Sequence, residues 1–352
     1  MHLFRRRVAP VKTVALLTTV LLTAPLAGAS ASSPGERRAT ATPSVEVSAA
    51  PVFDEYVALG DSFSAGPLIP LQRLDPLGCL RSTNNYPAFL ATFFASDSYV
   101  DVTCSGADTQ DMRNPQQTIV PGPDAPPQLD ALSPSTDLVT VGIGGNDYGL
   151  FGEMISECER VREQDPNGAP CKRLFTVDGI DTKKRDARLI QPRVGSVLAD
   201  IKERSPDAQV VVVGYLRLLP TRGTCEDVPF AKGDYRWGDE VEQVLNAGLR
   251  RAATNHGATY INMYPESRGH DACAGRDAWV NGSKIKPLRA ANFHPFFKGM
   301  RGIARESYRQ MTGLPAPDNR LPTPVVPAPP TATLTPAELR KLGEQFDAGG
   351  AQ

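Results

Sequence analysis

The sequence carries almost no net charge. Its 38 Lys and Arg residues balance 39 Asp and Glu residues, which leaves a formal charge of -1 over 352 residues. Proteins that bind nucleic acids or anionic surfaces through charge carry a basic excess, so neither is expected as the main partner. The six cysteines include no C-x-x-C pair, which argues against a structural zinc site. The apolar run at 14–26 falls short of the roughly 20 residues that span a membrane.

The N-terminus has the three parts of an export signal. Four cations among the first twelve residues precede the apolar run, and the small residues at 27–31 follow it. Residues 1–31 are therefore predicted to be a signal peptide that is cleaved after Ala29 or Ala31, with a retained membrane anchor as the alternative. The small, polar stretch at 32–52 is predicted to be a disordered spacer. The protein is thus expected to be secreted and extracellular.

From residue 53 onward, apolar strands alternate with amphipathic helices. Alternation of this kind is typical of a parallel sheet that helices wrap on both faces. The chain between 53 and 314 is long enough for one domain with a single sizeable core. We therefore expect an α/β fold with about five parallel strands. The strands are predicted at 56–59, 98–103, 137–142, 209–215 and 258–263, and the helices at 85–94, 188–204, 237–256 and 295–311.

The six cysteines fit the interpretation of an exported protein, because disulfides persist outside the cytosol. Sequence alone does not choose among the many pairings that six cysteines allow. Pairing in chain order is favoured, since each bridge would then close one loop beside the same edge of the sheet. The expected pairs are Cys79–Cys104, Cys158–Cys171 and Cys225–Cys273.

Polar corners follow two of the predicted strands. Gly60-Asp61-Ser62 ends the first strand, and Gly144-Gly145-Asn146-Asp147 ends the third. The carboxyl ends of parallel strands meet at one edge of the sheet, where open α/β folds place their sites. Ser62 is a candidate nucleophile there, but a serine hydroxyl needs a neutral histidine to take its proton and donors to hold the oxyanion. His294, at the start of a predicted helix, is the candidate base.

Four short blocks resemble those of the SGNH hydrolases, also called the GDSL family: Gly60-Asp61-Ser62-Phe63-Ser64, Ser105-Gly106, Gly144-Gly145-Asn146-Asp147 and His294-Pro295. Their order and spacing match the family, and the resemblance extends over residues 53–311. The layout of three cysteine pairs further resembles the secreted actinobacterial lipases, esterases and phospholipases of that family.

The resemblance implies a flavodoxin-like fold and a secreted ester hydrolase of the lipase, esterase or phospholipase type. Ser62 would be the nucleophile that forms an acyl-enzyme, and His294 would be its base. The backbone N–H groups of Ser62 and Gly106 and the side-chain amide of Asn146 would form the oxyanion hole. No metal or organic cofactor is implied. The expected partner is an ester or lipid substrate, with at most transient contact with a lipid surface, and the chain is expected to be a monomer.

One position departs from the family pattern. Most members place an aspartate three residues before the histidine to orient its ring, and here that position is Ala291. We therefore expect a Ser62–His294 dyad in which Nδ1–H donates to the backbone carbonyl of Ala291 or Asn292, as in some secreted actinobacterial members. A carboxylate from the preceding loop, Asp271 or Asp277, is the alternative orienting group.

The sequence bears on three other functional interpretations. An α/β-hydrolase nucleophile elbow, G-x-S-x-G, is excluded because Ser64 stands where its second glycine would be. A carbohydrate acetyl esterase remains open within the same family. A secreted binding module that keeps the fold without turnover is the alternative from another functional class.

The composition changes after residue 314. Residues 315–352 are predicted to be a proline-rich linker that ends in one short helix. Thr335-Pro336-Ala337-Glu338 matches a capping box and marks the start of that helix. No function is assigned to this segment.

Overall fold

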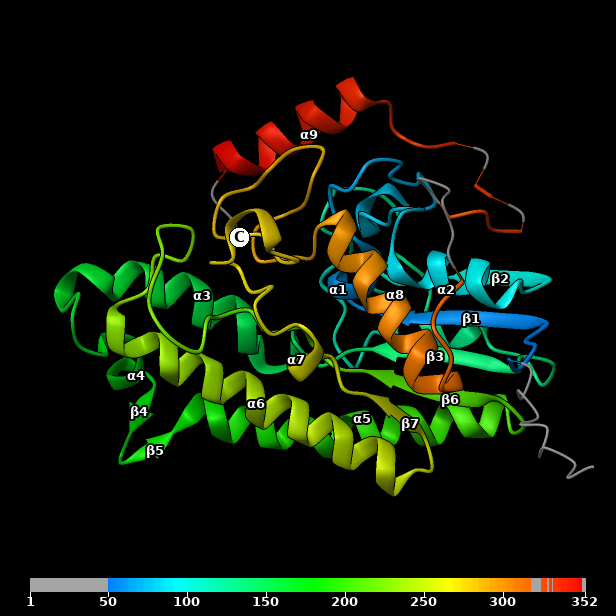
Figure 1. The fold of residues 1–352 in the computed structure, drawn as a ribbon, viewed down its shortest axis with the longest axis horizontal. Helices are drawn as coiled ribbons and strands as arrows, with labels where there is room; N and C mark the ends of the chain where they lie inside the picture. The colour runs from blue at the N-terminus through cyan, green and yellow to red at the C-terminus, as the bar shows by residue number, and fades with distance from the viewer. Residues whose placement is uncertain (1–49, 318–323, 328, 331, 350–352) are drawn as a thin grey trace, which may run out of the picture. The chain divides into compact units, whose positions relative to one another are not determined.

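The computed structural model describes residues 50–317, 324–327, 329–330 and 332–349 (Figure 1). The predicted signal peptide at 1–31 lies outside these residues, as does the predicted spacer up to residue 49. Within the described ranges, no helix is both long and apolar enough to cross a membrane.

Five parallel strands form the central sheet, as the sequence predicts. In chain order they are β1, Glu55–Gly60; β2, Ser98–Asp101; β3, Leu138–Gly142; β6, Gln209–Val213; and β7, Thr259–Ile261. They lie in the order β2-β1-β3-β6-β7, which is the flavodoxin-like arrangement. The strand order reverses at β1 and β3, where Gly60 pairs with Gly142. Folds of this class bind their ligands at that point, beyond the carboxyl ends of the strands.

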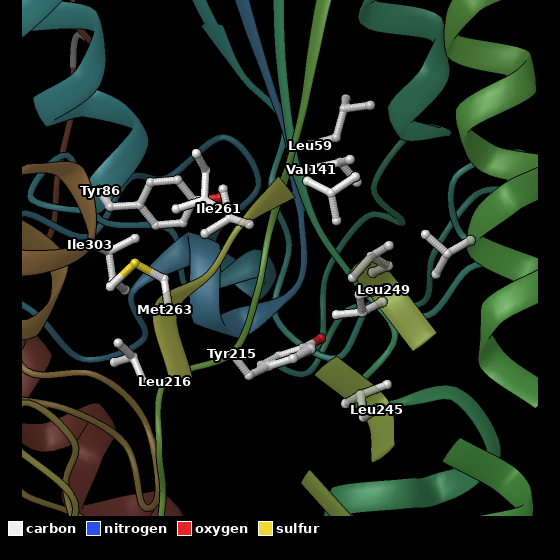
Figure 2. Close-up of a cluster of buried hydrophobic side chains, with 14 of the residues drawn as sticks. Leu59, Tyr86, Val141, Tyr215, Leu216, Leu245, Leu249, Ile261, Met263 and Ile303 are labelled. Carbon is white, nitrogen blue, oxygen red and sulfur yellow. The ribbon is translucent and has the colours of Figure 1, made fainter. Parts of the chain in front are cut away.

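Helices cover both faces of the sheet. α2 (Tyr86–Phe94) packs against α8 (Phe297–Thr312) on one face, and α5 (Thr182–Arg204) packs against α6 (Lys232–Asn255) on the other (Figure 1). Figure 2 shows the core side chains of both layers, with Tyr86, Met263 and Ile303 on one side of the strands and Leu245 and Leu249 on the other. The helices are α1, Ser62–Ala65; α2, Tyr86–Phe94; α3, Leu150–Val161; α4, Pro170–Leu174; α5, Thr182–Arg204; α6, Lys232–Asn255; α7, Met263–Glu266; α8, Phe297–Thr312; and α9, Pro336–Gly349.

Short elements complete the described fold. A two-stranded antiparallel hairpin lies between α4 and α5 and consists of β4, Thr176–Val177, and β5, Ile180–Asp181. The short 3₁₀ turns are Leu77–Cys79, Gln128–Ala131, Asp147–Gly149, Arg162–Gln164 and Gly275–Asp277.

The central strands are apolar along nearly their whole length. Every residue of β3 is buried, and so are the four consecutive valines of β6. Helices on both faces leave no side of these strands for polar side chains, so a continuous apolar run replaces the alternating pattern of a half-exposed strand.

Three helices begin at least two residues from where the local pattern predicts. One of them, α6, is predicted from residue 237 and begins at Lys232. α5 begins at Thr182, several residues earlier than expected, because the carboxylate of Asp181 caps it by accepting a hydrogen bond from an N–H of its first turn at 3.0 Å. α8 begins at Phe297, two residues later than expected, because Pro295 instead pairs with Val280 in an isolated β-bridge.

The structure pairs the six cysteines in chain order, Cys79–Cys104, Cys158–Cys171 and Cys225–Cys273. The first bridge lies beside the sheet edge, where Cys104 N donates to Gly60 O at 3.0 Å. It joins the loop that follows Ser62 to the segment that carries Gly106. A cross-link of this kind typically contributes about 2–4 kcal/mol to stability.

The described residues beyond 314 contact the rest of the domain. Leu334 N donates to the carbonyl of Gln72 at 2.8 Å. α9 begins at a capping box in which Glu338 Oε2 accepts hydrogen bonds from both the N–H and the hydroxyl of Thr335. Leu339 of this helix is fully buried, so α9 packs its apolar face instead of standing free in solvent.

Candidate active site

The turn after β1 presents Ser62 at the N-terminus of α1. Asp61 caps this helix, since its Oδ1 accepts a hydrogen bond from Phe63 N at 2.8 Å. Gly60 has a φ of 150°, and a Cβ there would lie 2.7 Å from the carbonyl oxygen of Gly142. The close approach of β1 and β3 therefore requires glycine at position 60. Ser62 keeps 9% of its surface exposed at this edge of the sheet.

His294 reaches the same corner from the loop that precedes α8. Its ring centroid lies 5.4 Å from that of Phe63, the residue after Ser62. Its Nδ1 lies 2.6 Å from the carbonyl oxygen of Asn292. Because a carbonyl oxygen only accepts hydrogen bonds, Nδ1 carries the proton, and Nε2 keeps the free lone pair that a general base needs.

The structure distinguishes the candidate orienting groups of His294. The ring bonds to the carbonyl of Asn292 rather than to that of Ala291. Neither Asp271 nor Asp277 bonds to the ring through its carboxylate; that of Asp271 accepts instead from an N–H two residues along its own loop at 3.0 Å. The acceptor on Nδ1 is thus an uncharged peptide oxygen.

Desolvation sets the charge state of His294, whose side chain is half-buried. Desolvation of the imidazole lowers the pKa of His294 to about 4, and the hydrogen bond to the carbonyl of Asn292, which acts in the opposite direction, only partly offsets it. The ordinary histidine pKa is about 6.5. A pKa below the ordinary value means that the neutral, proton-accepting form persists well into the acidic range.

We expect the His294 ring to titrate near pH 4 in the folded protein, and kcat/KM to keep its plateau below pH 6.5. NMR of the imidazole C–H resonances between about pH 3 and 8 measures the midpoint, with the His294 signal assigned by its loss in His294→Gln. Since the unfolded chain binds this proton more readily, the free energy of unfolding should fall as the pH drops from about 6.5 towards 4. Thermal unfolding measured at each pH shows whether the protein is still folded there. A titration midpoint of His294 at or above pH 6.5 would contradict the argument that desolvation lowers its pKa.

The loops after β2 and β3 supply the other predicted oxyanion donors. Gly106 has a φ of 82°, a left-handed conformation that favours glycine. Asn146 donates one amide hydrogen from Nδ2 to Ala107 O at 2.8 Å, which leaves its second hydrogen for an incoming oxygen. Among the residues that the structure describes, the N–H groups of Ser62 and Gly106 have no intramolecular acceptor. The predicted donors therefore lie at one edge of the sheet, and each of the three donor groups is uncharged.

Long-range hydrogen bonds connect these loops. Asp147, which is fully buried, accepts from Thr109 Oγ1 at 2.6 Å and from Arg193 Nη1 at 3.0 Å. Gln128 accepts from Gly60 N at 2.7 Å and donates to Gly60 O at 3.0 Å. The sequence did not reveal Thr109, Arg193 or Gln128, because they lie 38 to 68 residues from their partners and belong to none of the four blocks.

Apolar side chains border the site. Ile119 is 48% exposed, and its side chain lies 3.5 Å from where a Cβ on Gly106 would be. Tyr148, two residues after Asn146, is 38% exposed. Phe293 is buried and lines a small apolar cavity with residues of α3 and of the loop after β6. No group of three His, Cys, Asp or Glu side chains that could hold a metal ion occurs in the described part of the chain.

Comparison with known proteins identifies the family that the chain resembles. Residues 58–301 match the GDSL-like Lipase/Acylhydrolase family. The chain is 36% identical over 269 residues to Lipase 2 of Streptomyces coelicolor, an alignment that covers 74% of this chain and 86% of the lipase. Phospholipase A1 from Streptomyces albidoflavus has a similar crystal structure, with 29% identity and a TM-score of 0.59 over 71% of this chain and 96% of that one. The extracellular lipase from Streptomyces rimosus aligns with 27% identity and a TM-score of 0.60 over 72% and 97% of the two chains.

Proposed function

The chain belongs to the GDSL-like lipase/acylhydrolase family and is a carboxylic ester hydrolase, and on that basis we propose a secreted serine enzyme that cleaves lipid esters through an acyl-enzyme on Ser62. The hydrogen bond between His294 Nδ1 and the carbonyl of Asn292 is the observation that carries this proposal, because it leaves Nε2 as the base. The three disulfides, and the extracellular location given for the lipase from Streptomyces rimosus, support secretion.

In the acylation step, Nε2 of His294 takes the proton of the Ser62 hydroxyl while Oγ attacks the ester carbonyl carbon. The carbonyl electrons move onto the oxygen, which the N–H groups of Ser62 and Gly106 and the amide of Asn146 hold as an oxyanion. Collapse of this intermediate breaks the ester C–O bond, and the departing alcohol receives the proton from His294. The products are an alcohol and an acyl ester on Ser62.

Deacylation repeats the same steps with water. His294 removes a proton from a water molecule whose oxygen attacks the acyl carbonyl, and the same three donors hold the second oxyanion. The acid leaves, Ser62 regains its proton from His294, and the site returns to its starting state. The peptide carbonyl of Asn292 fixes the tautomer throughout, but as an uncharged group it stabilises the imidazolium less than a carboxylate would.

Apolar side chains at the site favour lipid esters over acetylated sugars. Ile119 lies beside Gly106 and Tyr148 follows Asn146 by two residues, and both side chains are partly exposed. A long acyl chain that covers such surface gains about 25 cal/mol for each Å² removed from water, whereas an acetyl group offers very little area.

Covalent labelling and an ester panel test the proposal. We expect a fluorophosphonate to label one residue per chain, and peptide mapping to identify it as Ser62. Hydrolysis rates are then compared for p-nitrophenyl esters from acetyl to long acyl and for phosphatidylcholine. Faster turnover of longer chains supports the lipid assignment, whereas a preference for acetylated sugars would favour a carbohydrate acetyl esterase. A purified chain that neither labels nor hydrolyses any ester would overturn the serine mechanism.

A further inference from the structure

The side chain of Tyr215 lies between the nucleophile turn and the loop that carries Asn146. Tyr215 follows β6, is only 2% exposed, and belongs to none of the four sequence blocks. Its ring packs edge-on against Phe63 at 5.0 Å and against Phe151 at 5.3 Å between centroids. Its main chain is held on both sides by Asn246, whose Oδ1 accepts from Tyr215 N at 2.9 Å and whose Nδ2 donates to Tyr215 O at 3.2 Å. The hydroxyl therefore has little freedom to move.

The Tyr215 hydroxyl makes two hydrogen bonds of opposite sense. It donates to Oδ2 of Asp61, the residue that caps α1 immediately before Ser62. It accepts from the N–H of Gly145, the residue immediately before Asn146, at 2.7 Å. Burial, followed by the neighbouring Asp61, raises the pKa of Tyr215 well above its ordinary value, so the hydroxyl keeps its proton and acts as the donor towards Asp61.

We propose that Tyr215 is a positioning residue for ester hydrolysis, whose hydroxyl holds the Ser62 turn and the Asn146 loop in register by bonding to Asp61 and Gly145. The inference rests on the proposed function, because it concerns the oxyanion donors of that reaction. One oxyanion donor, the N–H of Ser62, follows Asp61, and another, the amide of Asn146, follows Gly145. The hydroxyl oxygen of Tyr215 thus bonds to the residue before each of two oxyanion donors, although the turns that carry these donors lie far apart in the chain.

A purely structural role would have a different consequence. A tyrosine that only filled the core would change stability when its hydroxyl is removed, with no selective effect on the chemical step. A residue that positions oxyanion donors acts in the transition state, where charge develops on the substrate oxygen, and not in substrate binding. The separation of kcat from KM therefore distinguishes the two roles.

Tyr215→Phe removes the hydroxyl and keeps the ring contacts with Phe63 and Phe151. It leaves the buried N–H of Gly145 without an acceptor and Oδ2 of Asp61 without its donor. The Ser62 turn and the Asn146 loop then no longer bond to the same side chain. We expect kcat to fall about 10- to 100-fold with KM within about twofold, less than the roughly 100- to 1,000-fold loss typical of deleting an oxyanion donor outright. Steady-state kinetics on a p-nitrophenyl ester measures both values.

Tyr56→Phe is the matched control. Tyr56 is fully buried, and its hydroxyl bonds to Thr140 Oγ1 at 2.7 Å inside the sheet, away from the active-site corner. Both variants lose one buried tyrosine hydroxyl and should show comparable shifts in Tm. Only Tyr215→Phe should lose kcat. Equal kcat in both variants, or a loss in both, would overturn the positioning role.

Asp61→Asn provides a second, independent test. An asparagine keeps an oxygen to cap α1 but presents an amide group in place of the carboxylate that accepts the hydrogen bond from the Tyr215 hydroxyl. If Tyr215 acts through Asp61, the double variant should lose no more kcat than the more damaging single variant. Losses that multiply would show independent effects and overturn the proposal.

The two tests also separate this inference from the proposed function. An inactive, unlabelled wild-type chain would overturn both. An active wild type with unchanged kcat in Tyr215→Phe would overturn only the role of Tyr215. If Tyr215→Phe did not fold, Asp61→Asn alone should still reproduce the kcat-selective loss, and full activity in that variant would count against the proposal.

Discussion

Ser62→Ala is expected to lower kcat/KM by about 10⁵- to 10⁶-fold, because no other group can form the acyl-enzyme. The residual rate would come from the oxyanion donors and substrate binding alone. Stability should be nearly unchanged, since alanine suits the first turn of α1 and the capping bond from Phe63 N to Asp61 does not involve the serine side chain. Hydrolysis of a p-nitrophenyl ester and thermal unfolding measure the two quantities.

Ser64→Ala is the matched control for this variant. Ser64 lies two residues further along α1 and is also buried, but its hydroxyl bonds to Tyr86 at 3.2 Å in the core. It should therefore keep activity within several-fold of wild type. If Ser62→Ala retained more than about a hundredth of the wild-type rate, Ser62 would not be the nucleophile.

His294→Gln is expected to lower kcat/KM by about 10⁴- to 10⁶-fold, because it removes the proposed base that takes the Ser62 proton. Glutamine has a comparable length but cannot accept and return a proton near neutral pH. Fluorophosphonate labelling should slow to a similar extent, because that reaction also needs the serine proton removed. Kinetics and labelling rates together show whether the loss lies in nucleophile activation.

His270→Gln controls for the removal of a histidine that makes the same kind of contact with a backbone carbonyl. His270 Nδ1 also lies 2.7 Å from a backbone carbonyl, that of Asp277, and its ring stacks on Trp279 at 4.3 Å between centroids. Like His294, it places an imidazole nitrogen against a backbone carbonyl, but it belongs to a different loop from the proposed base. Its substitution should therefore leave kcat/KM within several-fold of wild type. A severe loss in His270→Gln, with activity preserved in His294→Gln, would show that the base is His270 and not His294.

Several features were predictable because they depend on short stretches of sequence. The four-valine run of β6 and the apolar runs of β1 and β3 indicated buried parallel strands, and the structure confirms five of them. The glycine-rich corners at Gly60 and Gly144 indicated tight turns after strands. Parallel topology then places such corners at one edge of the sheet.

The orientation of His294 was only partly predictable. Ala291 in place of an aspartate pointed to a backbone acceptor, yet two neighbouring carbonyls were equally close in sequence. Only the folded loop shows that the ring bonds to Asn292. The lowered pKa of His294 was likewise beyond prediction, because it arises from desolvation of the ring in the folded chain.

The amino-acid sequence by itself determined the strand–helix alternation, the family, and which residues make up the four sequence blocks, because these depend on local spacing and side-chain type. The tertiary structure alone decided how the corners are held together. Tyr215 and Asp61 lie 154 residues apart, and Gln128 and Gly60 lie 68 apart. Contacts of that range, and the desolvation that sets the charge of His294, exist only after the sheet and its helices have packed.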